Sequence, residues 1–162
     1  MRKVSSGDIL RRMDAERARE FLLTLPHVVE TPQWGGLVFW TGDKAIGGKM
    51  FALVNLEPGD TAVVMYAAGA ERFAELVEID GLIPAPYMAR IYWVAAERWS
   101  ALRNSEWEEQ FRVAHEITLG KLAKRVHEVL EMPAKARNKL IAERRKLLAE
   151  RAASAKAKKT KK

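Results

Sequence analysis

Hydrophobic residues recur along the first third of the chain with the period of an α-helix. After Asp14, apolar side chains return every three to four positions as far as Leu25, which predicts an amphipathic helix. Asp14 is a suitable N-cap for it, and Pro26 ends it because proline does not continue a helix. A second stripe of this kind, over residues 70–77, predicts a short helix that Gly81 terminates.

A longer helical stripe lies in the second half of the chain. Ser105 followed three residues later by Glu108 is a capping-box pattern, which predicts the start of this helix. We expect it to weaken at Gly120 and to end before Pro133. The predicted core face consists of Trp107, Phe111, Ala114, Thr118 and Leu122.

Short runs rich in β-branched and aromatic residues predict an antiparallel sheet between these helices. The last strong run follows Pro84 and Pro86, and its alternation places Ile91 and Trp93 on the face opposite Tyr92 and Val94. The predicted fold class is therefore α+β, with a sheet of about five strands packed against an N-terminal helix and a long C-terminal helix. The predicted strands are 37–40, 49–56, 61–66, 91–94 and, with a weaker signal, 98–102.

The distribution of charge divides the chain. The net charge is +7, yet residues 1–125 hold 16 Lys/Arg against 17 Asp/Glu, whereas residues 126–162 hold 12 against 4. The basic excess thus lies entirely at the C-terminal end. We predict an N-terminal extension (1–13), one domain (14–132) and a basic helical tail (133–162), of which residues 152–162 are expected to be disordered.

The residues that usually carry catalysis do not form a recognisable constellation. There is no cysteine, which excludes disulfides, thiolate zinc sites and cysteine nucleophiles. His27, His115 and His127 lack metal-ligand spacing, and no serine lies in a Gly-x-Ser-x-Gly elbow. We therefore expect no enzyme activity, no metal and no cofactor. No apolar stretch has the length of a signal peptide or a membrane span, so a soluble, cytoplasmic protein is expected.

The five tryptophans have two readings, a hydrophobic core or a platform on which bases stack. Trp93 and Trp107 fall on apolar faces at the proper period, so we expect both in the core. Trp40 and Trp99 remain open between the core and the rim of a partner site.

Four stretches of the chain form a recognisable series. They are Leu25-Pro26-His27-Val28-Val29-Glu30-Thr31, Trp34-Gly35, Gly48-Lys49-Met50-Phe51-Ala52, and Ile83-Pro84-Ala85-Pro86 through Trp93-Val94. Taken in order, they resemble the MmcQ/YjbR family, whose members are also called YjbR-like or CyaY-like domains. The resemblance covers residues 14–125 and implies a CyaY-like fold and a double-wing DNA-binding motif. The chain differs from the family at His27, where a glycine is usual, and at His115-Glu116.

This resemblance and the basic tail predict a DNA-binding protein with little sequence preference, whose hairpin wings and tail contact phosphates. The alternative is a non-catalytic module that binds a protein or a small ligand with its sheet face or a cleft. A pocket beside the proline-rich turn would be lined by Tyr87 and Arg90. The candidate nucleic-acid contacts are Lys44, Lys49, Arg90, Arg98, Arg103, Arg144, Arg145 and Lys146.

Overall fold

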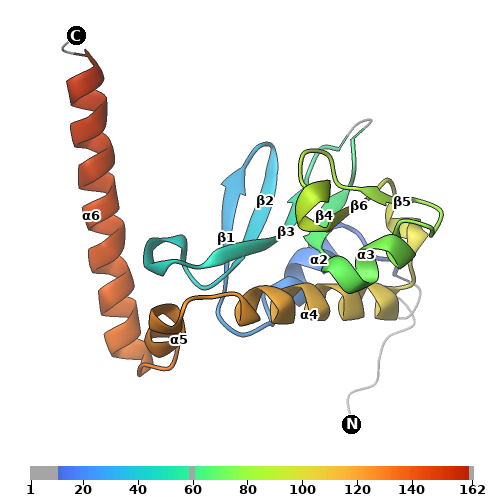
Figure 1. Cartoon of the computed structure of the whole chain (residues 1–162), viewed down its shortest axis with the longest axis horizontal. Coiled ribbons are helices and arrows are strands. Elements are labelled where there is room, and N and C mark those ends of the chain that lie inside the picture. The colour runs from blue at the N-terminus through green and yellow to red at the C-terminus, as the bar shows by residue number, and fades with distance from the viewer. Residues whose placement is uncertain (1–10, 59–60, 161–162) are drawn as a thin grey trace.

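Six antiparallel strands form one sheet in the order β1-β2-β3-β4-β6-β5 (Figure 1). The structure is a computed structural model, and it describes residues 11–58 and 61–160. It confirms the predicted α+β class. The strands are β1 (Val28–Gln33), β2 (Gly36–Thr41), β3 (Lys49–Asn55), β4 (Val64–Ala67), β5 (Leu82–Pro84) and β6 (Trp93–Ala96).

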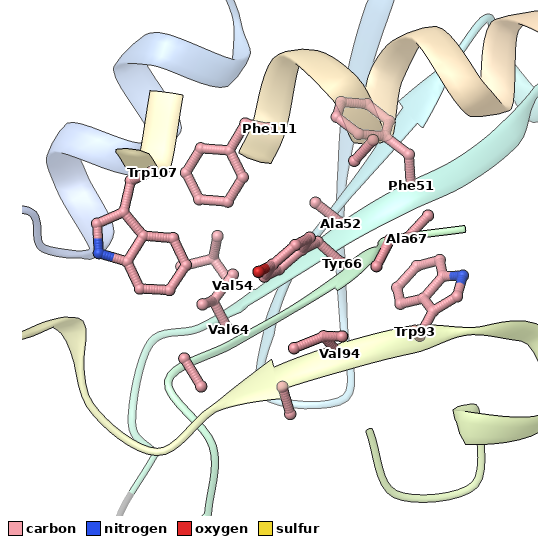
Figure 2. Close-up of a cluster of buried hydrophobic side chains, with 14 of the residues drawn as sticks. Phe51, Ala52, Val54, Val64, Tyr66, Ala67, Trp93, Val94, Trp107 and Phe111 are labelled. Carbon is pink, nitrogen blue, oxygen red and sulfur yellow. The ribbon is translucent and has the colours of Figure 1, made fainter. Parts of the chain in front are cut away.

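Helices α2 (Ala15–Leu22) and α4 (Asn104–Gly120) cover one face of this sheet and enclose the main core with it. Asp14 caps α2 as predicted, since its side chain accepts a hydrogen bond from the Arg17 backbone N–H at 2.8 Å. Figure 2 shows the centre of the core, where aromatic residues from α4 meet the side chains of β3, β4 and β6. The short helix α3 (Ala70–Leu76) adds Leu76 to the same core.

The two strands missed from the sequence, β1 and β5, are the edges of the sheet. Each contains a proline, Pro32 or Pro84, which argued against a strand. An edge strand tolerates proline, because one side of its backbone has no partner that needs an N–H. The weak strand expected at 98–102 was wrong, because this segment forms the 3-10 helix η3 (Trp99–Ala101).

The segment before β6 also differs from the prediction. Ile91 ends the 3-10 helix η2 (Ala89–Ile91), and Tyr92 adopts a left-handed backbone with φ 61°. The strand therefore begins at Trp93, and Ile91 and Tyr92 are largely exposed. Trp93 and Trp107 are buried in the core, as expected.

The start and end of α4 needed correction as well. The helix begins at Asn104, and Glu106 rather than Glu108 closes its first turn, since the Glu106 Oε1 accepts the Arg103 backbone N–H at 3.0 Å. This hydrogen bond and one from the Arg103 side chain lower the pKa of Glu106. The helix ends at Gly120, and α5 (Lys124–Leu130) is a separate helix.

The tail is an ordered helix, α6 (Ala134–Thr160), so the disorder expected from residue 152 onward was wrong as far as Thr160. The last two residues lie outside the described part of the chain. Figure 1 shows α6 leaving α5 and standing beside the domain, with its C-terminal half projecting from it. None of the described helices is long and apolar enough to cross a membrane.

Candidate nucleic-acid interface

A second, smaller core attaches the base of α6 to the domain. The buried residues Leu122, Val126 and Leu130 surround Ile46, which belongs to the 3-10 helix η1 (Lys44–Ile46) between β2 and β3. Ile141 of α6 packs against this group. Ile141 therefore anchors the base of α6 to the domain.

Polar contacts fix the same junction. The buried carboxylate of Asp43 caps η1 by accepting the Ala45 backbone N–H at 2.9 Å, and it forms an ion pair with Arg145 of α6. Arg137 donates to the backbone carbonyl oxygens of Leu130 and Met132, each at 3.2 Å. A buried carboxylate is costly without a partner, so the Asp43–Arg145 pair favours the docked helix.

This docking creates a basic groove, formed by η1, α5 and α6, with a volume of about 310 Å³. Three cations line it, namely Lys44, Arg125 and Arg144, and no acidic residue is among its lining. None of the three has a carboxylate within ion-pair distance in the described part of the chain. The Lys44 ammonium lies 5.7 Å from the centre of the Trp40 ring. The rest of the lining comes from Ala45, Ile46, Gly47, Val129, Leu140 and Leu148.

The structure thus brings together two of the candidates chosen from the sequence, Lys44 and Arg144, although they are 100 positions apart in the chain. Arg125 was not among the candidates. Its only sequence signal was its place at the boundary where the basic excess begins. The Arg145 guanidinium forms an ion pair with the Asp43 carboxylate. Lys146 is exposed on α6, outside the groove lining.

Lys49 lies close to this groove but on its own element. It opens β3 directly after Gly47 and Gly48, which lead the chain out of η1. A Cβ atom on Gly48 would overlap the carbonyl oxygen of Gly42, so only glycine fits this crossing. The crossing sets the position of Lys44 relative to Lys49.

The remaining candidates are elsewhere. Arg98 and Arg103 lie before α4, and each pairs with a carboxylate, Asp80 at 2.6 Å and Glu106 at 3.0 Å respectively. Tyr87 is 99% exposed with φ 64°, and neither it nor Arg90 lines the groove.

The β1–β2 and β3–β4 connections carry no Lys or Arg, in contrast to the β2–β3 connection, which contains Lys44. The turn between β1 and β2 exposes Trp34, and the sequence connecting β3 to β4 contains Leu56 and Glu57. Lys44 and Lys49 lie at the opposite ends of β2 and β3. Phosphate contacts through the β1–β2 and β3–β4 connections would therefore have to come from groups other than cations.

His115 has a structural role in the domain. It is buried, its Nε2 donates a hydrogen bond to the Pro26 carbonyl oxygen at 2.7 Å, and its ring packs edge-on against Phe51. His27 directly follows Pro26. Burial lowers the pKa of His27, and the nearby Arg137 and His115 lower it further.

The chain was compared with known proteins. No curated protein matches it. The crystal structure of Deinococcus radiodurans protein DR2400, with the domain DUF419, superposes with a TM-score of 0.64 at 21% identity, covering 74% of this chain and 89% of that one. At this low identity, the structural similarity establishes a shared fold alone. The model of the YjbR family matches residues 23–117, more than half of the sequence, with all six strands and most of α4. The chain therefore belongs to the YjbR family.

Proposed function

We propose that this YjbR protein binds DNA without catalysis and with little sequence preference, through the groove of Lys44, Arg125 and Arg144 and the basic helix α6. The observation that carries the proposal is the convergence of these three cations in one groove. Phosphates are the natural partners of such a site, because the phosphate backbone supplies most of sequence-independent affinity.

The composition of α6 supports the same proposal. Its 27 residues hold ten Lys/Arg and two Glu, and 27 residues of α-helix extend for about 40 Å. That length is close to one turn of duplex DNA, about 34 to 36 Å. The anchored base of α6 fixes its direction relative to the groove, so groove and helix would present their charge together.

The test compares two variants that lose the same charge. The groove variant is Arg125→Gln with Arg144→Gln, and the control is Arg12→Gln with Arg72→Gln, two arginines that are outside the groove and are not among the candidate contacts. Binding of a random duplex is measured by fluorescence anisotropy over a series of salt concentrations. In the groove variant we expect the slope of log affinity against log salt to fall by about 0.9 for each phosphate that the protein no longer neutralises, hence by about 1.8.

The control separates a local site from overall charge. We expect it to keep the slope of the parent protein. Equal losses in both variants would show that net charge alone drives binding, and unchanged binding in the groove variant would reject this site. Circular dichroism of both variants verifies that the fold is retained.

A further inference from the structure

A separate pocket of about 390 Å³ lies where the sheet opens beside the end of α4. β3 pairs with β4 only from Ala52 onward, so its first residues extend past β4. Gly69, with φ 83°, follows β4 here, and a Cβ atom on it would lie 3.1 Å from the Ile117 side chain. A glycine at this point leaves the space open.

The walls of the pocket are mostly apolar. They include Met50, Ile91 and Ile117 together with the ring of Trp93. Ile91 is exposed, so the apolar surface continues from the pocket to the outside. Ligand sites typically combine such walls with a few well-placed polar groups.

One of those polar groups is the indole N–H of Trp93. The N–H groups of Trp40 and Trp107 donate to the Thr31 hydroxyl and the Trp99 carbonyl oxygen, both at 2.8 Å. Trp93 is only 5% exposed, yet no residue in the described part of the chain accepts a hydrogen bond from its N–H. Figure 2 shows this nitrogen on the side of the ring turned away from Tyr66 and Val94. The N–H keeps some exposure toward the pocket, unlike the fully buried Tyr66 hydroxyl, and is therefore available to an acceptor on a bound ligand.

The other polar groups are two lysines, Lys49 and Lys121, which line the pocket from β3 and from the end of α4. Neither forms an ion pair among the described residues, and no acidic side chain contributes to the lining. The Thr118 hydroxyl is directed to its own helix, where it donates to the Ala114 carbonyl oxygen at 2.9 Å. The charged lining of the pocket is therefore wholly positive.

We propose that this pocket binds a small organic acid with a flat apolar body. The carboxylate lies between Lys49 and Lys121 and accepts the Trp93 N–H, and the apolar body lies against Ile91, Ile117 and the Trp93 ring. The pocket and the basic groove have no lining residue in common, so the acid and DNA are expected at separate sites, although Lys44 of the groove lies over the Trp40 ring that lines the pocket.

The probe for the experiment is 2-naphthoate, and 2-naphthalenemethanol is its neutral counterpart. Calorimetry gives the affinity of each for the full chain, and the ¹H–¹⁵N indole resonance of Trp93, assigned with Trp93→Phe, reports the site. We expect 2-naphthoate to bind and to shift this resonance, and the alcohol to bind at least tenfold more weakly.

Three variants then locate the site. Lys49→Met with Lys121→Met keeps apolar stems but removes both charges, and we expect a loss of at least tenfold in 2-naphthoate affinity. Lys124→Met with Lys139→Met removes the same charge outside the pocket and should change the affinity less than twofold. Ile117→Trp fills the pocket, keeps both lysines and should abolish binding.

The proposal is overturned if the alcohol binds as well as the acid, or if Ile117→Trp leaves 2-naphthoate affinity unchanged. Displacement of 2-naphthoate by duplex DNA would also overturn it, since the pocket would then belong to the nucleic-acid surface. A loss of DNA binding in the groove variant has no bearing on this result, so the two proposals fail separately.

Discussion

Tyr66 shows how a single residue in this core departs from the usual rules. Its ring is fully buried, edge-on to Trp107 and Phe111, while its hydroxyl has no hydrogen-bond partner among the described residues (Figure 2). Burial raises the pKa of this hydroxyl, which therefore stays protonated at neutral pH. The hydroxyl thus costs desolvation energy without a compensating bond.

We expect Tyr66→Phe to leave the free energy of unfolding unchanged or to raise it by about 1 kcal/mol, because it removes an unpaired polar group and keeps the ring. Urea unfolding followed by circular dichroism measures this difference. Tyr87→Phe is the control, since that side chain is fully solvated and its loss of a hydroxyl should have no effect. A loss of more than about 1 kcal/mol for Tyr66→Phe would reveal a hydrogen bond to the hydroxyl.

His27 illustrates what sequence reasoning could and could not provide at this scale. The resemblance marked it as a departure from a family glycine, and the structure gives the reason for that glycine, because His27 has φ 61°. The same is true of Tyr92, whose left-handed backbone interrupts a run of residues with high strand propensity. Propensity describes side chains on a regular backbone, so it does not reveal a single residue that turns the chain.

At the scale of elements, the crossing of Gly48 over Gly42 is a close approach of two backbone segments beside the basic groove. It holds η1 against the start of β3, and it therefore positions both the basic groove and Lys49. The two glycines have different reasons. Gly47 has φ 98°, whereas Gly48 is required for lack of space.

Gly48→Ala should lower the free energy of unfolding by about 1 to 3 kcal/mol, since its methyl group would displace backbone rather than a flexible side chain. Thermal and urea unfolding measure the loss. Gly120→Ala is the matched control: nothing lies within 4 Å of the added methyl group, and alanine at this last residue of α4 should stabilise by up to about 1 kcal/mol. Equal stability of the two variants would contradict the crowded crossing.

The elements that the sequence predicted correctly are those with strong periodicity. The core face of α4 was found because Trp107, Phe111, Ala114 and Thr118 repeat at helical spacing, and all four are buried. The edge strands were not found, because Pro32 and Pro84 are unfavourable everywhere in a sheet except at its edges. Only the pairing of the whole sheet identifies which strands those are.

At the scale of the molecule, the tail is part of the folded structure rather than an appendage. Its charge was evident from the sequence. Its docking was not, because Asp43 and Arg145 are 102 positions apart and each looks like an ordinary surface charge. Two of the three groove cations, Lys44 and Arg144, were therefore predicted as single residues, but their convergence was not.

Two truncations of the chain test the role of this docking. A cut after Met132 removes all of α6, and we expect weaker DNA binding, a flatter salt dependence and a loss of about 1 to 3 kcal/mol in stability, because the Asp43 carboxylate loses Arg145. A cut after Leu148 keeps Ile141, Arg144 and Arg145, so stability should be retained and the salt slope only partly reduced. Fluorescence anisotropy and thermal unfolding measure both effects.

The two cuts also separate the regions that contribute affinity. If the chain ending at Met132 binds DNA as tightly as the full protein, the interaction resides in the sheet domain rather than in α6. If the two truncated chains are weakened to the same extent, the projecting half of α6 binds the phosphates and the groove does not.

The attachment of α6 at its base alone makes the helix a lever. It meets the domain at η1 and at the smaller core, and Arg145, which pairs with Asp43, is the last of its residues with an ion pair to the domain. About 15 residues of the helix follow, an arm of roughly 22 Å at 1.5 Å per residue, so a rotation of about 10° at the junction moves the end by about 4 Å. Small rearrangements around Asp43 would thus be amplified into displacements comparable with the rise of about 3.4 Å per base pair of duplex DNA.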